Sequence, residues 1–222
     1  MSFAKEKNYY SHQRSDLLRL LPANIKLERA LDVGCGIGAT GQYLKNHWQV
    51  NEVVGIELNA EMAQQAQAVL DKVVIGDIQS IDLPFAPSYF DGIICADVLE
   101  HLYDPWSVLK KLKTYLKDSG YLLLSVPNVQ HWSMIVKLLA GKWHYQHEGI
   151  LDSTHIRFFT RSSLVKMIEQ TGFEIEKMSS AMGREIRFIN LVTLGMFSNF
   201  FSFRYFILAR KSNRKSCELS VL

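Results

Sequence analysis

Five short, unbroken runs of apolar residues recur along the first 126 residues and alternate with segments of helical periodicity. Unbroken apolar runs are typical of parallel strands, because helices cover both faces of a parallel sheet and neither face meets water. The alternation of such strands with helices predicts an open, doubly wound parallel sheet. The predicted strands lie at Ala30–Val33, Val53–Ile56, Val73–Ile75, Ile93–Ala96 and Tyr121–Val126.

Two of the intervening segments carry signals for the start of a helix. Asp104 is followed by Pro105, which places a cap and then a proline at the first helical position. Gly120 is expected to turn the chain from this helix into the next strand. Asn59 is a good N-cap residue for an earlier helix, whose predicted apolar face consists of Met62, Ala66, Val69 and Leu70.

The last third of the chain has a different pattern. Phe173 and Ile175 alternate with glutamates, which predicts a half-exposed strand, and Phe203–Ala209 predicts another. We expect these two as a sixth and a seventh strand, paired antiparallel at the edge of the sheet.

The composition is that of an ordinary globular protein, with 48% hydrophobic and 21% charged residues in 222. This length suits one domain with a sizeable core. A formal net charge of +3 is too small to indicate nucleic-acid binding. The three cysteines are far apart and form no CxxC, so we expect no disulfide framework and no zinc site, which favours a cytoplasmic location.

One apolar and aromatic segment, Phe188–Phe203, tests whether the chain enters a membrane. It is shorter than the roughly 20 residues that a membrane span needs, and Asn190 and Asn199 interrupt it, so we expect no transmembrane span. Three interpretations stay open. The segment packs on the core or on a partner, makes a peripheral contact with a membrane, or covers a lipophilic substrate.

A glycine-rich stretch, LDVGCGIGATG, follows the first predicted strand. Gly34, Gly36 and Gly38 allow a tight turn and a close approach of a ligand to the backbone. The stretch also fits the G-x-G-x-x-G/A fingerprint of nucleotide-binding loops. Glu57 follows about 20 residues later, at the end of the second predicted strand, where a carboxylate can bind two ribose hydroxyls.

Asp32 distinguishes between two ligands that both carry an adenosine ribose. NAD would bring a pyrophosphate to this loop, and a carboxylate beside it would repel that group. S-adenosylmethionine would instead bring an ammonium group, which a carboxylate attracts. Asp77, at the end of the third predicted strand, supplies a further acid where an adenine amine can be recognised.

At these motifs the chain resembles the class I S-adenosylmethionine-dependent methyltransferases, a group that includes ubiquinone-type and sugar-type enzymes. The resemblance covers roughly residues 30–128 and rests on LDVGCGIGATG, VVGIELN, GDI, LPFAPSYFDGIICADVLEHLYDP and GYLLLSVPN. It implies a Rossmann-like sheet of seven strands, mostly parallel, with an antiparallel last strand. We expect one domain over 1–222, with an N-terminal helical cap (about 1–29), a cofactor-binding core (about 30–128) and a substrate-side insertion with C-terminal strands (about 129–222).

The resemblance also implies a role for each matching residue. Methyl transfer is an in-line displacement, to which positioning of the two reactants contributes most of the catalysis. The residues implied in cofactor binding are Asp32, Gly34, Gly36 and Gly38 around the methionine part, Glu57 at the ribose, Asp77 and Ile78 beside adenine, and Ala96 and Asp97 closing the pocket.

Two histidines are candidates for the base that an oxygen nucleophile needs. His101, in VLEHLYDP, follows the fourth predicted strand, and a role in the structure or around the cofactor is the alternative. His155 lies in DSTHIRFFT, which resembles a segment of methyltransferases of glycan biosynthesis, and Arg157 would bind a phosphate or a carboxylate of the acceptor. The alternative is that His155 and Arg157 only attach this segment to the sheet.

Trp143 and His144 complete the predicted acceptor side, and a packing role is the alternative for Trp143. His144 and His147 have a spacing that would suit a metal, but no nearby acid or cysteine completes a site, so we expect no metal.

The predicted function is transfer of a methyl group from S-adenosylmethionine to a small molecule, more readily at oxygen than at nitrogen or carbon. A sugar or glycan precursor is the first acceptor class and a lipophilic, quinone-like molecule the second. The alternatives are a methyltransferase-like partner protein that binds the cofactor without turnover and supports another biosynthetic enzyme, and a nicotinamide oxidoreductase. The sequence leaves a homodimer open.

Overall fold

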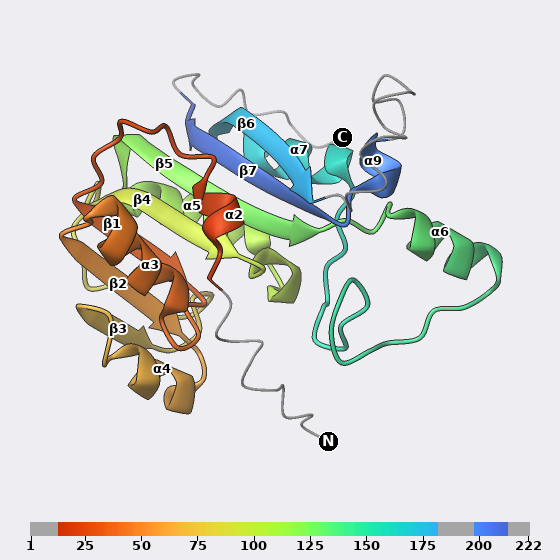
Figure 1. Ribbon diagram of the computed structural model, residues 1–222, viewed down its shortest axis with the longest axis horizontal. Coiled ribbons are helices and arrows are strands. Elements are labelled where there is room, and N and C mark those ends of the chain that lie inside the picture. The colour runs from red at the N-terminus through yellow and green to blue at the C-terminus, as the bar shows by residue number, and fades with distance from the viewer. Residues whose placement is uncertain (1–12, 182–197, 213–222) are drawn as a thin grey trace.

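The computed structural model describes residues 13–181 and 198–212 of the chain. Its seven strands form one sheet in the order β3-β2-β1-β4-β5-β7-β6 (Figure 1). The strands are Arg29–Val33 (β1), Glu52–Glu57 (β2), Lys72–Ile75 (β3), Phe90–Ala96 (β4), Leu116–Pro127 (β5), Phe173–Ala181 (β6) and Arg204–Lys211 (β7). The first five pair in parallel, and β7 lies antiparallel between β5 and β6. This confirms the predicted Rossmann-like α/β sheet with an antiparallel last strand.

Short helices connect these strands. They are Ser15–Leu18 (α2), Ala39–Trp48 (α3), Ala60–Ala66 (α4), the 3-10 turn Leu99–His101 (η1), Pro105–Tyr115 (α5), Trp132–Leu139 (α6), Arg161–Gln170 (α7) and Ser198–Phe201 (α9). The predicted caps begin two of them, since the side chain of Asn59 accepts N–H groups at the start of α4 and Asp104 accepts the N–H of Ser107 in α5. The predicted division of the domain into three parts stays a prediction.

Two boundaries differ from the expectation. Helix α4 ends at Ala66, and the chain tightens so that the N–H of Val69 bonds to the carbonyl of Ala66. Val69 and Leu70 therefore lie beyond the helix, although Leu70 is buried as expected. Strand β5 begins at Leu116 and contains Gly120, so this glycine does not separate helix from strand.

A bulge explains the position of Gly120. Phe90 of β4 faces Leu116 of β5, whereas Gly92 faces Tyr121, so β5 has extra residues between these two pairs. A Cβ atom on Gly120 would lie 2.6 Å from the side chain of Leu116 and 3.0 Å from the carbonyl oxygen of Asp91. Glycine therefore relieves crowding inside the bulge.

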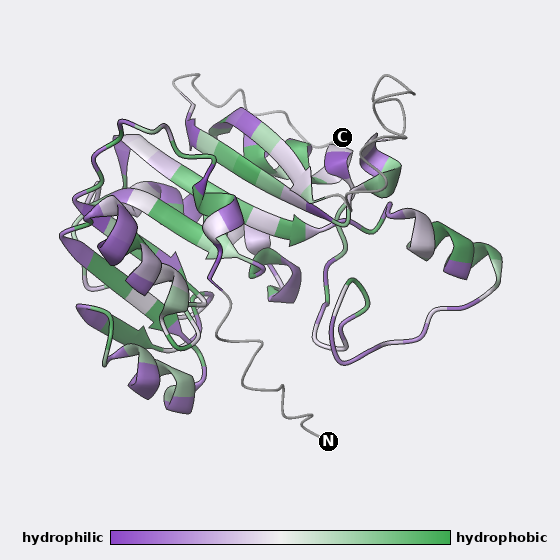
Figure 2. Ribbon diagram, viewed as in Figure 1, coloured by the Kyte–Doolittle hydropathy of each residue, from purple (hydrophilic) through white to green (hydrophobic). Residues whose placement is uncertain are grey.

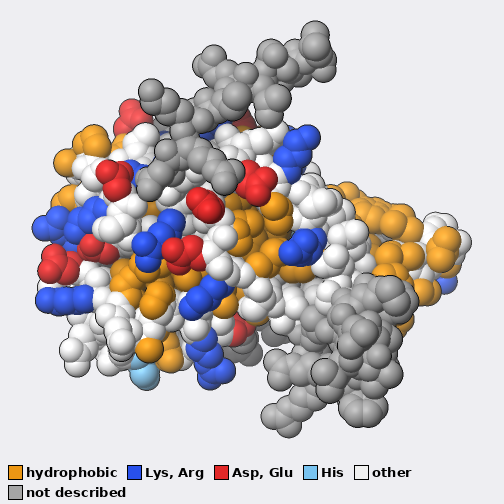
Figure 3. All heavy atoms as spheres, turned by 90° about the horizontal axis from the view of Figure 1, so that it is seen from above, with side chains coloured by type: hydrophobic (Ala, Val, Ile, Leu, Met, Phe, Trp, Pro, Cys, Tyr) orange, Lys and Arg blue, Asp and Glu red, His pale blue; other side chains and the backbone are white. Residues whose placement is uncertain are grey.

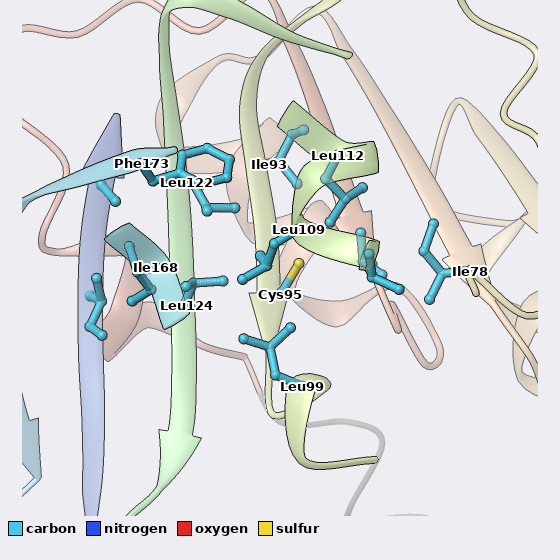
Figure 4. Packing of buried hydrophobic residues seen from close by; sticks show 14 of the residues in the cluster. Ile78, Ile93, Cys95, Leu99, Leu109, Leu112, Leu122, Leu124, Ile168 and Phe173 are labelled. Carbon is cyan, nitrogen blue, oxygen red and sulfur yellow. The ribbon is translucent and has the colours of Figure 1, made fainter. Parts of the chain in front are cut away.

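Apolar side chains are buried on both faces of the sheet, which accounts for the unbroken apolar runs. Ile93 and Ile94 are neighbours in β4, and they belong to separate hydrophobic clusters on opposite faces. Figure 4 shows the first cluster, where Leu109 and Leu112 of α5 and Ile168 of α7 pack against the sheet. Figure 2 shows the same division, with apolar central strands and helices that carry hydrophilic residues. The two cores hold the ends of β1, β2 and β4 in fixed positions.

The apolar segment Phe188–Phe203 falls mostly outside the described residues. Its last part forms α9 and leads directly into β7. Across residues 13–181 and 198–212, every helix is too short or too polar to span a bilayer.

Candidate active site

The glycine loop that follows β1 has backbone angles that residues with a side chain rarely adopt. Gly34, Gly36 and Gly38 have φ angles of 68°, 56° and 84°, in the left-handed region. The N–H of Gly34 donates to the carbonyl of Ile56 at the end of β2, over 2.8 Å. A Cβ atom on Gly34 would lie 2.9 Å from Cγ2 of Val98. The loop therefore needs glycine both for its backbone angles and for its close packing.

A cavity of about 440 Å³ opens beside this loop, at the carboxyl ends of β1, β2 and β4. This is the edge where parallel α/β sheets bind ligands. The predicted residues that line it are Asp32, Gly34, Gly36, Glu57, Asp77, Ile78, Ala96, Asp97 and His101. Those that the sequence analysis did not single out include Arg14, Thr40, Leu58, Gln79, Val98, Leu102 and Thr154.

Gly38 stands apart from the other two glycines because it does not line the cavity. It is the residue before α3, and a Cβ atom there would lie 2.7 Å from Cγ2 of Val69 and 3.1 Å from Leu70. Its position is that of a glycine that lets a helix pack closely against its neighbours.

Glu57 ties the loop to the next helix. One carboxylate oxygen accepts the N–H of Gly36 over 2.8 Å, and the other accepts the N–H of Asn59 over 2.9 Å. Each oxygen has a second lone pair, so the carboxylate can accept further donors from the cavity. Glu57 thus fixes the geometry of the loop and contributes negative charge to the cavity wall.

Asp32 is a carboxyl group of the cavity wall in which one oxygen lacks a hydrogen-bond partner among the described residues. It is buried, and its Oδ2 atom has no hydrogen-bond partner among the described residues. Burial raises the pKa of this carboxyl to about 7, and the charge of Glu57 adds to the rise. The backbone N–H of Gly41 and the guanidinium of Arg14 oppose it. A cationic donor in the cavity would satisfy the oxygen and favour its charged form.

Asp97 closes the cavity after β4 in a strained conformation, with a φ angle of 57°. Ser125 holds it on β5, since the hydroxyl donates to Oδ1 over 3.0 Å. Arg14 and Arg204 form ion pairs with the same carboxylate, the latter at 3.0 Å. Arg14 and Arg204 come from opposite ends of the chain, and neither lies in a motif, so the sequence held no signal for this cluster.

Asp77 and Gln79 form the wall after β3. The carboxylate of Asp77 accepts the N–H of Gln79 over 2.9 Å, which shapes the turn. Among the described residues, the carboxylates of Asp32, Glu57, Asp77 and Asp97 line the cavity, and Arg14 contributes the one guanidinium. This excess of carboxylates favours a cationic ligand over a phosphate-bearing one.

His101 lies at the cavity wall on η1. Its Nδ1 atom lies 3.1 Å from both the carbonyl oxygen and the hydroxyl oxygen of Thr154. The carbonyl oxygen can only accept, which favours a proton on Nδ1. In the neutral ring the lone pair is then on Nε2. This tautomer is the one that a base acting through Nε2 would require.

His155 lies behind His101 rather than at the cavity. It is buried, its ring centroid lies 4.8 Å from that of His101, and its Nδ1 atom donates to the carbonyl of Ile150 over 3.0 Å. Its Nε2 atom is 4.0 Å from Oε1 of Glu100, a buried carboxyl. Burial and the charge of Asp97 raise the pKa of Glu100 well above its usual range.

Glu100, His101 and His155 are also residue types that bind metals, and their ligand atoms lie within 4.8 Å of one another. Two ligand atoms that each lie about 2.1 Å from one ion are at most about 4.2 Å apart. A metal ion would therefore bind here only with every pair of these ligand atoms within about 4.2 Å of each other. The expectation of no metal stays a prediction.

The other predicted acceptor residues lie outside the cavity lining. Arg157 is exposed, and its Nε atom donates to the carbonyl of Tyr103 over 3.1 Å, while its guanidinium lies 5.8 Å from the ring of Trp106. Trp143 packs edge-on against Phe158, and His144 is exposed. The backbone N–H groups of residues 156 and 157 both donate to the carbonyl of Glu100, so this segment is attached to η1.

A comparison with protein families identifies the family of this chain. A family model described as a methyltransferase domain matches residues 6–178. The chain belongs to this methyltransferase family. S-adenosylmethionine is the methyl donor of the family.

Two curated relatives of this methyltransferase are similar over part of its length. A ubiquinone biosynthesis O-methyltransferase of Aliivibrio fischeri is 26% identical over 152 residues, which are 66% of this chain and 64% of that protein. A malonyl-[acyl-carrier protein] O-methyltransferase of Herminiimonas arsenicoxydans is 36% identical over 109 residues, which are 49% of this chain and 40% of that protein. The chain thus spans less than two thirds of either relative.

Solved structures agree with the fold of the methyltransferase. A SAM-dependent methyltransferase from Archaeoglobus fulgidus superposes with a TM-score of 0.65 and 22% identity, over 89% of this chain and 92% of that one. An S-adenosylmethionine-dependent methyltransferase from Mesorhizobium loti gives 0.64 and 17%, over 89% and 96%.

Proposed function

We propose that this protein transfers a methyl group from S-adenosylmethionine to a small-molecule acceptor. The observation that carries the proposal is the buried Oδ2 atom of Asp32, which has no hydrogen-bond partner among the described residues and belongs to a residue that lines the cavity together with Glu57, Asp77 and Asp97. An ammonium group satisfies such an oxygen, whereas the pyrophosphate of NAD would be repelled by it. The glycine loop and Glu57 would complete the binding of the methionine part and the ribose.

The bound cofactor would supply an activated methyl group, and this chain would position it. The left-handed glycines let the loop backbone approach the methionine part, while Asp77 and Ile78 would flank adenine. Asp97 is held by Ser125, Arg14 and Arg204, so it would close the pocket in one fixed position. Positioning of this kind is the main contribution that an enzyme makes to an in-line displacement.

We assign the base for an oxygen nucleophile to His101. It is the one predicted catalytic histidine that lines the cavity, and the contact with Thr154 supports a lone pair on Nε2. His155 would act through it, since it packs against His101 from the buried side. The contact of Arg157 with the carbonyl of Tyr103 supports an attachment role over binding of an anionic acceptor.

The acceptor is proposed as a sugar or glycan precursor, or a lipophilic, quinone-like molecule. The first rests on the segment around His155, and the second gains support from the similarity to a ubiquinone biosynthesis O-methyltransferase. A quinone-like acceptor resides in a membrane, so a peripheral membrane contact and a cytoplasmic location would suit it. A homodimer stays a prediction.

Calorimetric titration of the purified protein with S-adenosylmethionine, S-adenosylhomocysteine and NAD tests the proposal. We expect micromolar binding of the first two and none of NAD. Tighter binding of NAD would contradict the assignment. Labelled S-adenosylmethionine, offered with nucleotide sugars and separately with membrane lipid extracts, then tests the acceptor class. Cofactor binding without label transfer, together with a stoichiometric co-purifying protein, would favour the partner-protein alternative.

A further inference from the structure

Helix α6 extends away from the sheet (Figure 1). It exposes apolar side chains to solvent. The exposed fractions are 41% for Trp132, 53% for Val136, 52% for Leu138 and 85% for Leu139. Figure 2 shows the end of this helix as strongly hydrophobic, and Figure 3 shows hydrophobic side chains gathered at that end of the molecule. Single exposed apolar residues are ordinary, but a contiguous set on one helix marks an interaction surface.

The helix is apolar on two sides. Met134 is buried and packs inward with Ile150 and Leu151 in a small cluster of its own. On the opposite side, positions 132, 136 and 139 follow the i, i+4, i+7 spacing of one helix face, and position 135 lies between them. We call Trp132, Ile135, Val136 and Leu139 the outward face of α6.

The charged residues nearest to this face in the sequence have one sign. Lys137 lies within α6, and Lys142 follows three residues after its end. The stretch 119–147, which contains the whole helix, has no aspartate or glutamate, and Glu148 is the first acid after it. An apolar face that contains tryptophan and leucine and is accompanied by lysines matches what the surface of an anionic bilayer binds.

We propose that the outward face of α6 docks on the surface of an anionic lipid bilayer. An eight-residue helix is about 12 Å long, so its outward face inserts only its side chains and does not span. The same shortness argues against a second copy of the chain as occupant, because a stable protein interface buries about 800 Å² on each partner. The lysines would remain at the level of the lipid headgroups and pair with phosphate.

This inference does not depend on methyl transfer, since none of the residues of the outward face lines the cofactor cavity. Vesicle flotation of the full chain tests it, with vesicles of phosphatidylglycerol and phosphatidylcholine compared with vesicles of phosphatidylcholine alone. We expect flotation with the anionic vesicles and much weaker flotation with the neutral ones. Failure of the protein to float with anionic vesicles would overturn the proposal, whatever the cofactor titration gives.

A pair of variants separates α6 from the rest of the surface. The double substitution Val136→Glu with Leu139→Glu is expected to weaken vesicle binding at least about tenfold, because it replaces inserted apolar groups by charges. Gln64→Glu with Gln67→Glu adds the same two charges at exposed positions in and after α4, at the other edge of the sheet, and should bind as the wild type does. Unchanged melting temperature and S-adenosylhomocysteine affinity would establish that both variants are folded.

A second variant tests the charge. Lys137→Gln with Lys142→Gln is expected to reduce binding to anionic vesicles about thirtyfold, since each lysine near an anionic surface contributes about 1 kcal/mol. Equal flotation of the Val136→Glu, Leu139→Glu variant and the wild type would overturn the proposal. So would a wild-type dimer in light scattering that this variant dissociates, because the occupant would then be a second copy.

Discussion

Replacement of Asp32 by asparagine should make the protein more stable and its cofactor binding weaker. The pKa of Asp32 rises from 3.8 to about 7 on folding, mainly because burial disfavours the charge. A carboxyl with a raised pKa destabilises the fold increasingly with pH. The cost is absent below pH 3.8, grows between pH 3.8 and 7, and is constant above. About three pKa units, at 1.36 kcal/mol each, come to about 4 kcal/mol at pH 8.

Asparagine keeps a carbonyl oxygen for the N–H of Gly41 and removes the buried charge. The free energy of unfolding of the variant at pH 8 should therefore exceed that of the wild type by up to about 4 kcal/mol. It also loses a charge-assisted contact with the ammonium of S-adenosylmethionine, which is worth about 1.5–3 kcal/mol and corresponds to a Kd about 10- to 100-fold higher.

Urea unfolding followed by tryptophan fluorescence, at pH 5 and pH 8, measures the first effect, and calorimetry measures the second. The stability difference between Asp32→Asn and the wild type should be larger at pH 8 than at pH 5. Asp82→Asn, at an exposed acid, is the control and should change neither quantity. Equal stability of Asp32→Asn and the wild type at pH 8 would refute the argument from burial, and equal affinity would refute the contact with the ammonium group.

Three further substitutions test separate parts of the site. Glu57→Gln should weaken S-adenosylhomocysteine binding by about 1–3 kcal/mol in calorimetry, because glutamine keeps one acceptor oxygen but its NH2 group cannot accept the second of the two N–H groups that Glu57 binds. Unchanged affinity would contradict a role at the ribose. Gly34→Ala should lower the melting temperature, because the new methyl group would lie 2.9 Å from Cγ2 of Val98 and the backbone would have to keep a φ angle of 68°. An unaltered melting temperature would contradict this crowding. His101→Gln should leave S-adenosylhomocysteine affinity unchanged and reduce turnover of the acceptor found in the screen by about 10²- to 10⁴-fold; full activity would exclude it as the base.

The local features of this fold could be predicted from the sequence because each depends on neighbouring residues. Unbroken apolar runs marked the parallel strands, since residues such as Ile93 and Ile94 are buried on opposite faces. The caps at Asn59 and Asp104 were predictable because each contacts N–H groups within a few residues. The predicted end of α4 and the predicted turn at Gly120 were wrong, since α4 ends at Ala66 and Gly120 lies in a bulge that depends on the register between β4 and β5.

The candidate site likewise has parts that could be predicted from the sequence and parts that depend on tertiary contacts. The glycine loop and Glu57 follow from the sequence because the carboxyl ends of consecutive parallel strands meet at one edge. Whether His101 or His155 faces the cavity depended on how two segments about 50 residues apart pack together, and the structure places His101 in front. The cluster of Arg14 and Arg204 on Asp97 had no local signal. The sequence pattern thus determined the strands, the glycine loop and the edge of the sheet where the cofactor is proposed to bind. Contacts between residues distant in the chain decided which side chains share the cavity, because such contacts form only when those segments pack together in the folded protein.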